Sequence, residues 1–227
     1  MSLNKVKPGS NMYDWITHTW PVGRGCHHQC SYCYVHAIGG QPVEFIPQPK
    51  PDLGKGKTIF VGNCIDLFAA EMPQQEIDAV LRHCNKYPGN KYVFQTKNPE
   101  RMFDNLHQIP QVIPGQSTLG TTIETDNAEI LARYSKAPTA LHRAHGMYHC
   151  QLGGFKTFVT VEPIMKFNLR AMLALIGRPD FVNIGADSKG HTLPEPSHDE
   201  VMALIHALRD SGIQVILKEN LGRLIKC

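Results

Sequence analysis

Short apolar segments alternate with amphipathic helical patterns along the chain, and this alternation constrains the fold more than any other feature. Most of these segments are nearly continuous in apolar character, as strands buried on both faces of a parallel sheet are. They cover residues 15–20, 58–62, 91–96, 118–123, 157–161, 181–185 and 214–218. Because parallel neighbours need right-handed crossovers, the pattern predicts an open or closed βα barrel, with a flat doubly wound sheet as the alternative.

Proline and capping residues mark where the helices between these strands begin. Pro73 and Pro99 stand at first-turn positions, and Asp126, Asn168 and Ser197 are predicted N-caps. Ser197 also begins the pattern of a capping box. The residues predicted to face the core are Ile77, Val80, Leu81 and Cys84, then Met102 and Leu106, then Ile130, Leu131 and Tyr134, then Ala171, Met172 and Leu175, then Val201, Leu204, Ile205 and Leu208.

Composition places the chain among ordinary globular proteins. Of its 227 residues, 42% are hydrophobic and 19% are charged, which excludes a disordered chain. No apolar run approaches the roughly 18–20 residues that span a bilayer, and no apolar stretch follows the first lysines as in a signal peptide. We therefore expect a cytoplasmic protein with no membrane contact.

The chain is expected to form a single domain over residues 1–227. Residues 1–12 are predicted to be a flexible N-terminal tail, and residues 39–57 a Pro- and Gly-rich arm. Residues 1–57 contain six Lys or Arg and three Asp or Glu, so this segment accounts for the whole net charge of +3. This excess of positive charge favours an anionic partner near the segment, although a solvated lysine-rich loop would show the same pattern.

Three cysteines crowd into eight residues as Cys26-x3-Cys30-x2-Cys33. Three soft thiolates on one tight loop can bind three irons of a [4Fe–4S] cluster and leave the fourth iron open to a small molecule. His27 and His28 provide the alternative, because with these cysteines they could complete a tetrahedral zinc site. A distant second pair of ligands, which structural zinc sites usually have, is missing from the sequence.

Polar residues follow most of the predicted strands. Active sites of βα barrels lie at the C-terminal ends of the strands, so these residues are candidates for a site, although many strand ends carry helix caps and ion pairs. They are Asn63, Cys64, Asp66, Lys97, Glu124, Asp126, Glu162, Asp187, Lys218 and Glu219.

The cysteine spacing, with the aromatic Tyr32 before the last cysteine, resembles the signature of the radical S-adenosylmethionine (SAM) superfamily. The run from Tyr13 to Trp20 and the segments 66–68, 96–99, 161–163 and 184–185 resemble a phage-associated and bacterial subfamily of unknown substrate, and more distantly spore photoproduct lyase. The resemblance implies a partial (βα)6 barrel, with an extra strand here at 214–218. It also implies a [4Fe–4S] cluster that reductively cleaves SAM to a 5′-deoxyadenosyl radical, and a flavodoxin- or ferredoxin-type reductant as partner.

The resemblance also assigns roles to individual residues. Tyr32 would contact the adenine, Asn63 would lie where the methionine amine is bound, and Lys97 would pair with the methionine carboxylate. Thr122 or Glu124 would hold the ribose, Gly185 would leave room for the adenine, and Glu162 is a further candidate ligand. A structural ion pair between Lys97 and Glu162 is the alternative for those two residues. Cys64 is a candidate hydrogen donor, with a space-filling buried cysteine as its alternative.

Of all aspects of the function, the sequence determines the substrate least. The resemblance favours a nucleotide or a nucleic-acid base, with a protein or a small metabolite as alternatives. Its phosphates would meet the basic residues Arg24, Lys50, Lys55 and Lys57, with His27 and His28 near the cluster. The two functions from other classes are a structural zinc-binding module and a nucleic-acid-binding module without catalysis.

Overall fold

The structure is a computed structural model that describes residues 3–40, 42–107 and 115–225. Its main sheet contains eight strands among the described residues. They are β1 (Asn4–Lys5), β2 (His18–Trp20), β5 (Thr58–Val61), β6 (Lys91–Gln95), β7 (Ser117–Thr122), β8 (Lys156–Val161), β9 (Phe181–Ile184) and β10 (Gln214–Leu217). A separate two-stranded sheet pairs β3 (Gly23–Arg24) with β4 (Ile46–Pro47).

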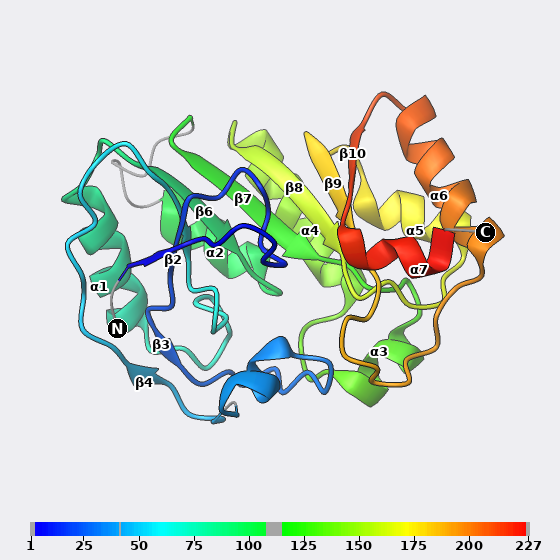
Figure 1. Cartoon of the computed structure of the whole chain (residues 1–227). Helices are drawn as coiled ribbons and strands as arrows, with labels where there is room; N and C mark the ends of the chain where they lie inside the picture. The colour runs from blue at the N-terminus through cyan, green and yellow to red at the C-terminus, as the bar shows by residue number, and fades with distance from the viewer. Residues whose placement is uncertain (1–2, 41, 108–114, 226–227) are drawn as a thin grey trace.

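The main sheet is parallel from β2 to β10, in the order β2-β5-β6-β7-β8-β9-β10, and β1 is added antiparallel at the β2 edge. Every strand predicted from the sequence is present, and all but β2 agree with the prediction to within one residue at each end. The strand order follows the chain order, which is typical of a barrel rather than a doubly wound sheet. Figure 1 shows the sheet curving with helices along one side. The partial barrel with one extra C-terminal strand is confirmed, and β1 was not predicted.

The helices alternate with the strands. They are α1 (Gln74–Asn85), α2 (Pro99–His107), α3 (Ala128–Tyr134), α4 (Ala140–Leu152), α5 (Leu169–Ile176), α6 (His198–Asp210) and α7 (Gly222–Ile225), with 3-10 turns η1 (Tyr34–Ile38) and η2 (Glu219–Leu221). The capping box at Ser197 and the cap at Asn168 are confirmed. The cap of α3 was assigned to the wrong residue, because the side chain of Asn127 accepts from the first-turn backbone, whereas Asp126 accepts from the backbone N–H of Asn168.

Aromatic rings fill the interior of the partial barrel. Phe158 is fully buried and stacks on Phe181, with ring centroids 5.2 Å apart, while Trp15 meets both rings edge-on. Gly120 on β7 makes room for this packing, because a Cβ at that position would lie 2.2 Å from the Phe158 ring. Complete burial of such a ring contributes about 1.5–3 kcal/mol. The ring cluster therefore closes the interior below the polar ends of the strands.

The N-terminal segment crosses the C-terminal ends of the strands. The Nζ of Lys218 donates to the backbone oxygen of Asn11 at 2.8 Å, and the Asn11 side chain donates to Glu162 at 3.3 Å. The Oη of Tyr13 lies 2.7 Å from Oγ1 of Thr160 on β8. Residues 4–13 therefore form a wall over the end of the barrel where strand-end residues meet.

Candidate active site

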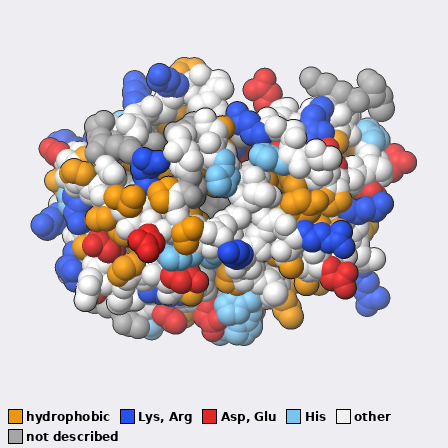
Figure 2. Space-filling view, turned by 90° about the horizontal axis from the view of Figure 1, so that it is seen from below, with side chains coloured by type: hydrophobic (Ala, Val, Ile, Leu, Met, Phe, Trp, Pro, Cys, Tyr) orange, Lys and Arg blue, Asp and Glu red, His pale blue; other side chains and the backbone are white. Residues whose placement is uncertain are grey.

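One cavity of about 670 Å³ lies at the C-terminal ends of the parallel strands. Residues that follow β5, β6, β8 and β9 line it, together with the N-terminal segment and the cysteine loop between β3 and η1. The rule that barrel sites lie at this end of the sheet holds for this cavity. Figure 2 views the molecule from this end and shows Lys, Arg and His side chains distributed over the face.

The three cysteines of the motif all line this cavity. Cys30 is buried and lies close enough to Cys26 and Cys33 to influence the ionisation of both thiols. Burial raises the pKa of Cys26 to about 12 and also raises that of Cys33. A metal that binds here must displace the thiol protons, as thiolate ligation does in general.

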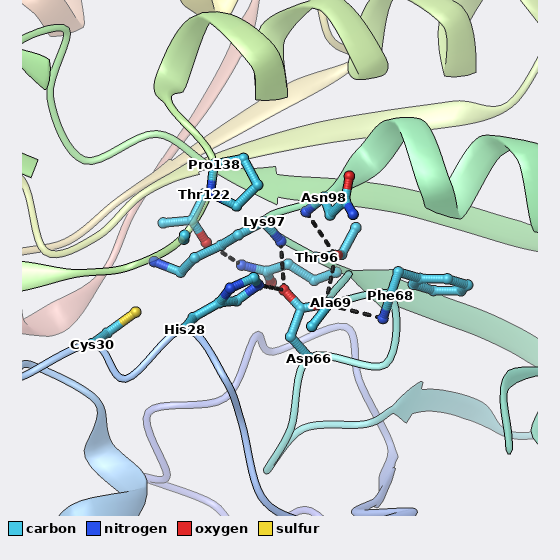
Figure 3. A network of polar contacts seen from close by, with 12 residues as sticks. His28, Cys30, Asp66, Phe68, Ala69, Thr96, Lys97, Asn98, Thr122 and Pro138 are labelled. Carbon is cyan, nitrogen blue, oxygen red and sulfur yellow. Dashed lines mark hydrogen bonds and ion pairs between the residues drawn. The ribbon is translucent and has the colours of Figure 1, made fainter. Parts of the chain in front are cut away.

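His28 is bound to a buried carboxylate rather than to the cysteines. Its Nε2 lies 2.8 Å from Oδ2 of Asp66, which also accepts from the backbone N–H of Lys97 at 2.7 Å, while Oδ1 lies 2.5 Å from Oγ1 of Thr96 (Figure 3). Burial opposes ionisation of Asp66, but His28 and these hydrogen bonds outweigh it and lower the pKa of Asp66 to about 2. In the described ranges, no three His, Cys, Asp or Glu side chains are arranged to hold a single metal ion. His28 is thus held by Asp66, and the described side chains do not form a zinc site completed by His28.

A second buried network lies behind the cysteine loop. The Oη of Tyr32 donates to Oε1 of Glu124 at 2.6 Å and accepts from Nζ of Lys97 at 2.9 Å, while Lys97 also pairs directly with Glu124. The Nη1 of Arg143 donates to Oε2 of Glu124 at 2.8 Å. Burial alone would raise the pKa of Glu124, but Arg143 and Lys97 hold it well below its ordinary value. The pKa of Lys97 is raised even though burial opposes it, because Cys30 and Glu124 attract its charge.

Two predicted ligands, Glu124 and Glu162, differ from the prediction in position or in partner. Glu124 is fully buried and does not line the cavity, because Lys97, Tyr32 and Arg143 occupy its carboxylate oxygens. The alternative ion pair between Lys97 and Glu162 is wrong. Glu162 instead pairs with Nζ of Lys218 at 2.6 Å, and Lys97 pairs with Glu124.

The space beside Gly185 is filled by the side chain of Glu162 and is not open. A Cβ at Gly185 would lie 2.8 Å from Cδ of Glu162 and 2.9 Å from Oδ1 of Asn220. Asn220 donates to Oε1 of Glu162 at 2.7 Å, so the glycine lets these two side chains meet. Gly185 does not line the cavity, whereas Glu162 does.

The turn after β5 places Asn63 and Cys64 at the cavity. Gly62 begins this turn with a φ of 79°, a conformation that side chains disfavour. The Nδ2 of Asn63 lies 3.4 Å from Sγ of Cys64, and the hydroxyl of Tyr34 lies 3.9 Å from the same sulfur. Burial raises the pKa of the Cys64 thiol, so this sulfur keeps its proton at neutral pH.

The base of the cavity holds polar groups that join three strands. The Oη of Tyr13 donates to Oε1 of Gln95 at 2.8 Å, and Nε2 of Gln95 donates to Oγ1 of Thr122 at 2.9 Å. Tyr13, Gln95, Thr122 and Thr160 all line the cavity. Tyr32, Asn63, Cys64, Lys97 and Glu162 line it too, so six of the eight residues with an individually predicted role, Thr122 included, lie at the cavity with the three cysteines. The strand-end candidates Asp66, Asp187 and Lys218 also line it.

Three exposed lysines border the cavity. Lys5 and Lys7 belong to the N-terminal wall and Lys189 to the loop after β9. None of the three forms an ion pair with a carboxylate of the described residues, whereas each carboxylate that lines the cavity has a basic partner. The three lysines of the arm that were predicted from the sequence lie elsewhere. Lys50, Lys55 and Lys57 do not line the cavity, and the arm that carries them packs against α1 through a 2.7 Å contact between His83 and the Pro51 carbonyl.

Sequence reasoning missed Arg143 and Ser135. Arg143 is fully buried in α4, a helix that was not predicted, and Ser135 ends α3 with its hydroxyl 3.0 Å from Sγ of Cys30. Neither residue stands in a motif or at the end of a predicted strand. The Thr139 that caps α4 was the available sequence signal for the helix.

Comparison with solved structures shows the same fold in enzymes of low sequence identity. A point mutant of spore photoproduct lyase gives a TM-score of 0.63 at 10% identity, covering 95% of this chain and 81% of that chain. Spore photoproduct lyase with bound AdoMet and dinucleoside spore photoproduct gives 0.55 at 11% identity, covering 88% and 64%. Streptococcus suis SuiB bound to S-adenosylmethionine gives 0.56 at 10% identity, covering 88% and 49%. The chain thus has a fold like that of radical SAM enzymes.

Sequence comparison places the chain in a family. No curated protein sequence matches it. In the described parts of the chain, every helix is too short or too polar to cross a membrane. A sequence model of the family described as "Protein of unknown function (DUF5131)" matches residues 40–188, about two thirds of the chain. The chain therefore belongs to the DUF5131 family.

Proposed function

We propose that this chain is a radical SAM enzyme that holds a [4Fe–4S] cluster on Cys26, Cys30 and Cys33 and binds SAM in the adjoining cavity. One observation carries the proposal: the three cysteines of the motif all line a cavity at the C-terminal ends of parallel strands. When bound, the cluster would supply the electron that cleaves SAM to methionine and a 5′-deoxyadenosyl radical, which takes a hydrogen atom from the substrate.

The donor set fits this cluster. Three thiolates leave one iron of a [4Fe–4S] cluster without a protein ligand, as binding of SAM to iron requires. His28 is engaged by Asp66 and Glu124 is enclosed by cations, so neither stands free as a fourth ligand.

The cavity offers groups for each part of SAM. Lys97, at the cavity wall, supplies a cation for the methionine carboxylate, and Asn63 supplies an amide near the amine. Thr122 and Glu162 supply oxygens for the ribose hydroxyls, and Tyr32 an aromatic face for the adenine. Glu124 and Gly185 act through their neighbours, because Glu124 holds Lys97 and Tyr32 in place and Gly185 makes room for Glu162.

Cys64 is proposed as the hydrogen donor of the reaction. Its sulfur lies at the cavity, and its raised pKa keeps the S–H bond intact at neutral pH. A thiol can return a hydrogen atom to a substrate radical only while it carries that hydrogen, and the transfer would leave a thiyl radical on Cys64 that an electron from the reductant and a proton from solvent convert back to the thiol. The variant Cys64→Ala should bind the cluster and SAM normally but lose formation of the product that requires hydrogen return, measured by product analysis once a substrate is found.

The cluster is tested by anaerobic reconstitution. We expect brown protein with about four iron atoms per chain. Replacing Cys26, Cys30 or Cys33 with Ala should abolish the iron, whereas Cys84→Ala and Cys150→Ala should not, because these two thiols are buried in the core away from the cavity. Colourless protein with one zinc per chain would refute the enzyme proposal in favour of a structural zinc module.

Cleavage of SAM is tested with the reduced protein. With dithionite, the wild type should form 5′-deoxyadenosine from SAM slowly even without a substrate. Lys97→Ala should weaken SAM binding by about 10-fold or more, since a charge-assisted hydrogen bond contributes about 1.5–3 kcal/mol. Unchanged SAM affinity in this variant would assign Lys97 to the support of Glu124 alone.

For the substrate, we propose a nucleotide or a nucleic-acid base carried on a phosphate backbone. The cavity is bordered by Lys5, Lys7 and Lys189, which have no carboxylate partner in the described residues. A solved relative in fold, spore photoproduct lyase, is complexed with dinucleoside spore photoproduct. These lysines replace the arm as the place where phosphates are expected to bind.

Two triple variants distinguish the cavity lysines from the arm. Affinity for single-stranded DNA, RNA and mononucleotides is measured across salt concentrations. Replacing Lys5, Lys7 and Lys189 with Gln should flatten the salt dependence by up to about 2 units of slope, at roughly 0.7 per phosphate contact. The matched triple of Lys50, Lys55 and Lys57 should keep the wild-type slope. The reverse result would assign binding to the arm, and no binding tighter than about millimolar would favour a peptide or metabolite substrate.

A further inference from the structure

Cys30 differs from the other two cysteines of the motif in its surroundings. It is 7% exposed, and its sulfur lies 3.0 Å from the hydroxyl oxygen of Ser135, a residue more than a hundred positions away in the sequence. Ser135 is itself buried and ends helix α3. A polar contact between two buried side chains so distant in sequence is specified by the fold rather than by the cysteine loop.

The other contact of the Ser135 hydroxyl leaves its proton free to be donated. Its oxygen accepts a hydrogen bond from the backbone N–H of Ala137 at 3.1 Å. A hydroxyl group has a single proton, and that proton remains available for the sulfur of Cys30. A sulfur bound to iron is a thiolate without a proton, so in the metal-bound state the bond runs from Oγ of Ser135 to Sγ of Cys30.

The backbone around Ser135 holds this hydroxyl in place. Ser31 N–H donates to the carbonyl of Tyr134 at 2.8 Å, and Lys136 N–H donates to the carbonyl of His28 at 2.8 Å. The N–H of Ser135 donates to the carbonyl of Leu131 at 3.0 Å, which fixes the residue at the end of α3. The cysteine loop and the segment 134–136 are therefore joined on both sides of the O–H···S contact.

We propose that Ser135 is a positioning residue that raises the reduction potential of the cluster by hydrogen bonding to the sulfur of Cys30. Reduction adds negative charge to the cluster and its sulfurs, and a hydrogen bond to sulfur stabilises the more negative state. The proposal rests on the proposed function, because it requires iron bound through Cys30. In this role the hydroxyl would make transfer of an electron from the reductant to the cluster more favourable.

The test is an anaerobic redox titration of the reconstituted protein, followed by electron paramagnetic resonance of the reduced cluster. Ser135→Ala should lower the equilibrium constant for reduction about tenfold, which for one electron is a midpoint about 59 mV more negative. Ser31→Ala is the matched control, because Ser31 lies on the same loop with an exposed side chain, and it should keep the wild-type midpoint.

A second pair of variants separates the hydroxyl from the shape of the side chain. Ser135 has φ −154° and ψ 142°, an extended conformation that β-branched residues adopt readily. Ser135→Thr keeps the hydroxyl and Ser135→Val removes it at nearly the same volume. The Thr variant should titrate near the wild type and the Val variant near Ser135→Ala.

Three results would overturn the proposal. Equal midpoints for Thr and Val would show that the hydroxyl does not affect the cluster, as would a wild-type midpoint in a fully loaded Ser135→Ala protein. Loss of iron from both Ala and Val variants, with normal loading in Thr, would assign the hydroxyl to cluster assembly instead. A wild type that binds no iron–sulfur cluster refutes the proposed function itself, so the two failures are distinguishable.

Discussion

Replacing Arg143 with Met is the strongest test of the buried network behind the cysteine loop. Arg143 is fully buried, and it donates to Oε2 of Glu124 and to the carbonyl of Thr122, both at 2.8 Å, and to the carbonyl of Pro138 at 2.7 Å. The variant Arg143→Met keeps much of the side-chain volume but removes the charge and every one of these donors. The carboxylate of Glu124 would then have one cationic partner, Lys97, instead of two.

The expected cost follows from the burial of both partners. Removing one member of a buried ion pair costs about 3–5 kcal/mol; here Glu124 loses one of its two cations, and three acceptors lose the donors of Arg143. At a urea m-value of about 3 kcal/mol/M for a chain of this size, the unfolding midpoint should fall by about 1–1.7 M. In the double variant with Glu124→Gln, the total cost should be smaller than the sum of the two single costs, since Glu124→Gln alone leaves two buried cations without their carboxylate and the double variant leaves only Lys97.

The assay is urea unfolding of the metal-free protein under reducing conditions, monitored by circular dichroism. Arg209→Met is the matched control, because Arg209 is an exposed arginine on helix α6, and it should change the free energy of unfolding by less than about 0.5 kcal/mol. A cost below about 1 kcal/mol for Arg143→Met would contradict the reasoning. Strict additivity of the two changes in the double variant would show that Arg143 and Glu124 are not coupled.

Two further predictions concern the barrel interior and the acid limb of stability. Phe158→Ala should lower the free energy of unfolding by about 3–5 kcal/mol in the same urea assay, because it empties the centre of the ring cluster; a cost under about 1 kcal/mol would show that the rings close over the gap. Asp66 has its pKa lowered to about 2 in the folded chain, so its contribution is present above about pH 4 and is lost as the pH falls towards 2. Asp66→Asn should therefore weaken the dependence of stability on pH between about 4 and 2, and an unchanged acid limb would place the acid sensitivity in other carboxyl groups.

The strands were predictable because their sequence signal and their burial have the same cause. The segments at 58–62, 157–161 and 181–185 are apolar almost throughout, and the strands observed there are covered on both faces. Strand ends then located Asn63, Lys97 and Glu162 at the cavity, because parallel strands bring their C-terminal ends to one edge. For these three residues, a position directly after a predicted strand was enough to predict that they lie at the site.

Helix α4 escaped prediction because three of its large apolar residues are exposed and one of its charged residues is buried. Leu141, Tyr148 and Leu152 are exposed, with 72%, 56% and 67% of their surface accessible, while Arg143 is completely buried. Periodicity assumes that apolar residues face inward, so it could not find this helix or the charge that it carries into the core. Arg143 orients Glu124, and Glu124 pairs with Lys97, so the sequence pattern could not predict the partner of Lys97.

The cysteine loop is held in place by groups that do not depend on a metal. On one side, His28 bonds to Asp66, which in turn accepts from the backbone of Lys97 at the end of β6. On the other side, the segment after α3 bonds to the loop through two backbone contacts and the hydroxyl of Ser135. Structural zinc modules use the metal to fold, whereas a catalytic centre must keep one coordination position open within a scaffold that is already formed. A loop fixed from both sides by the barrel meets the second requirement, and this favours a catalytic cluster over a structural zinc at Cys26, Cys30 and Cys33.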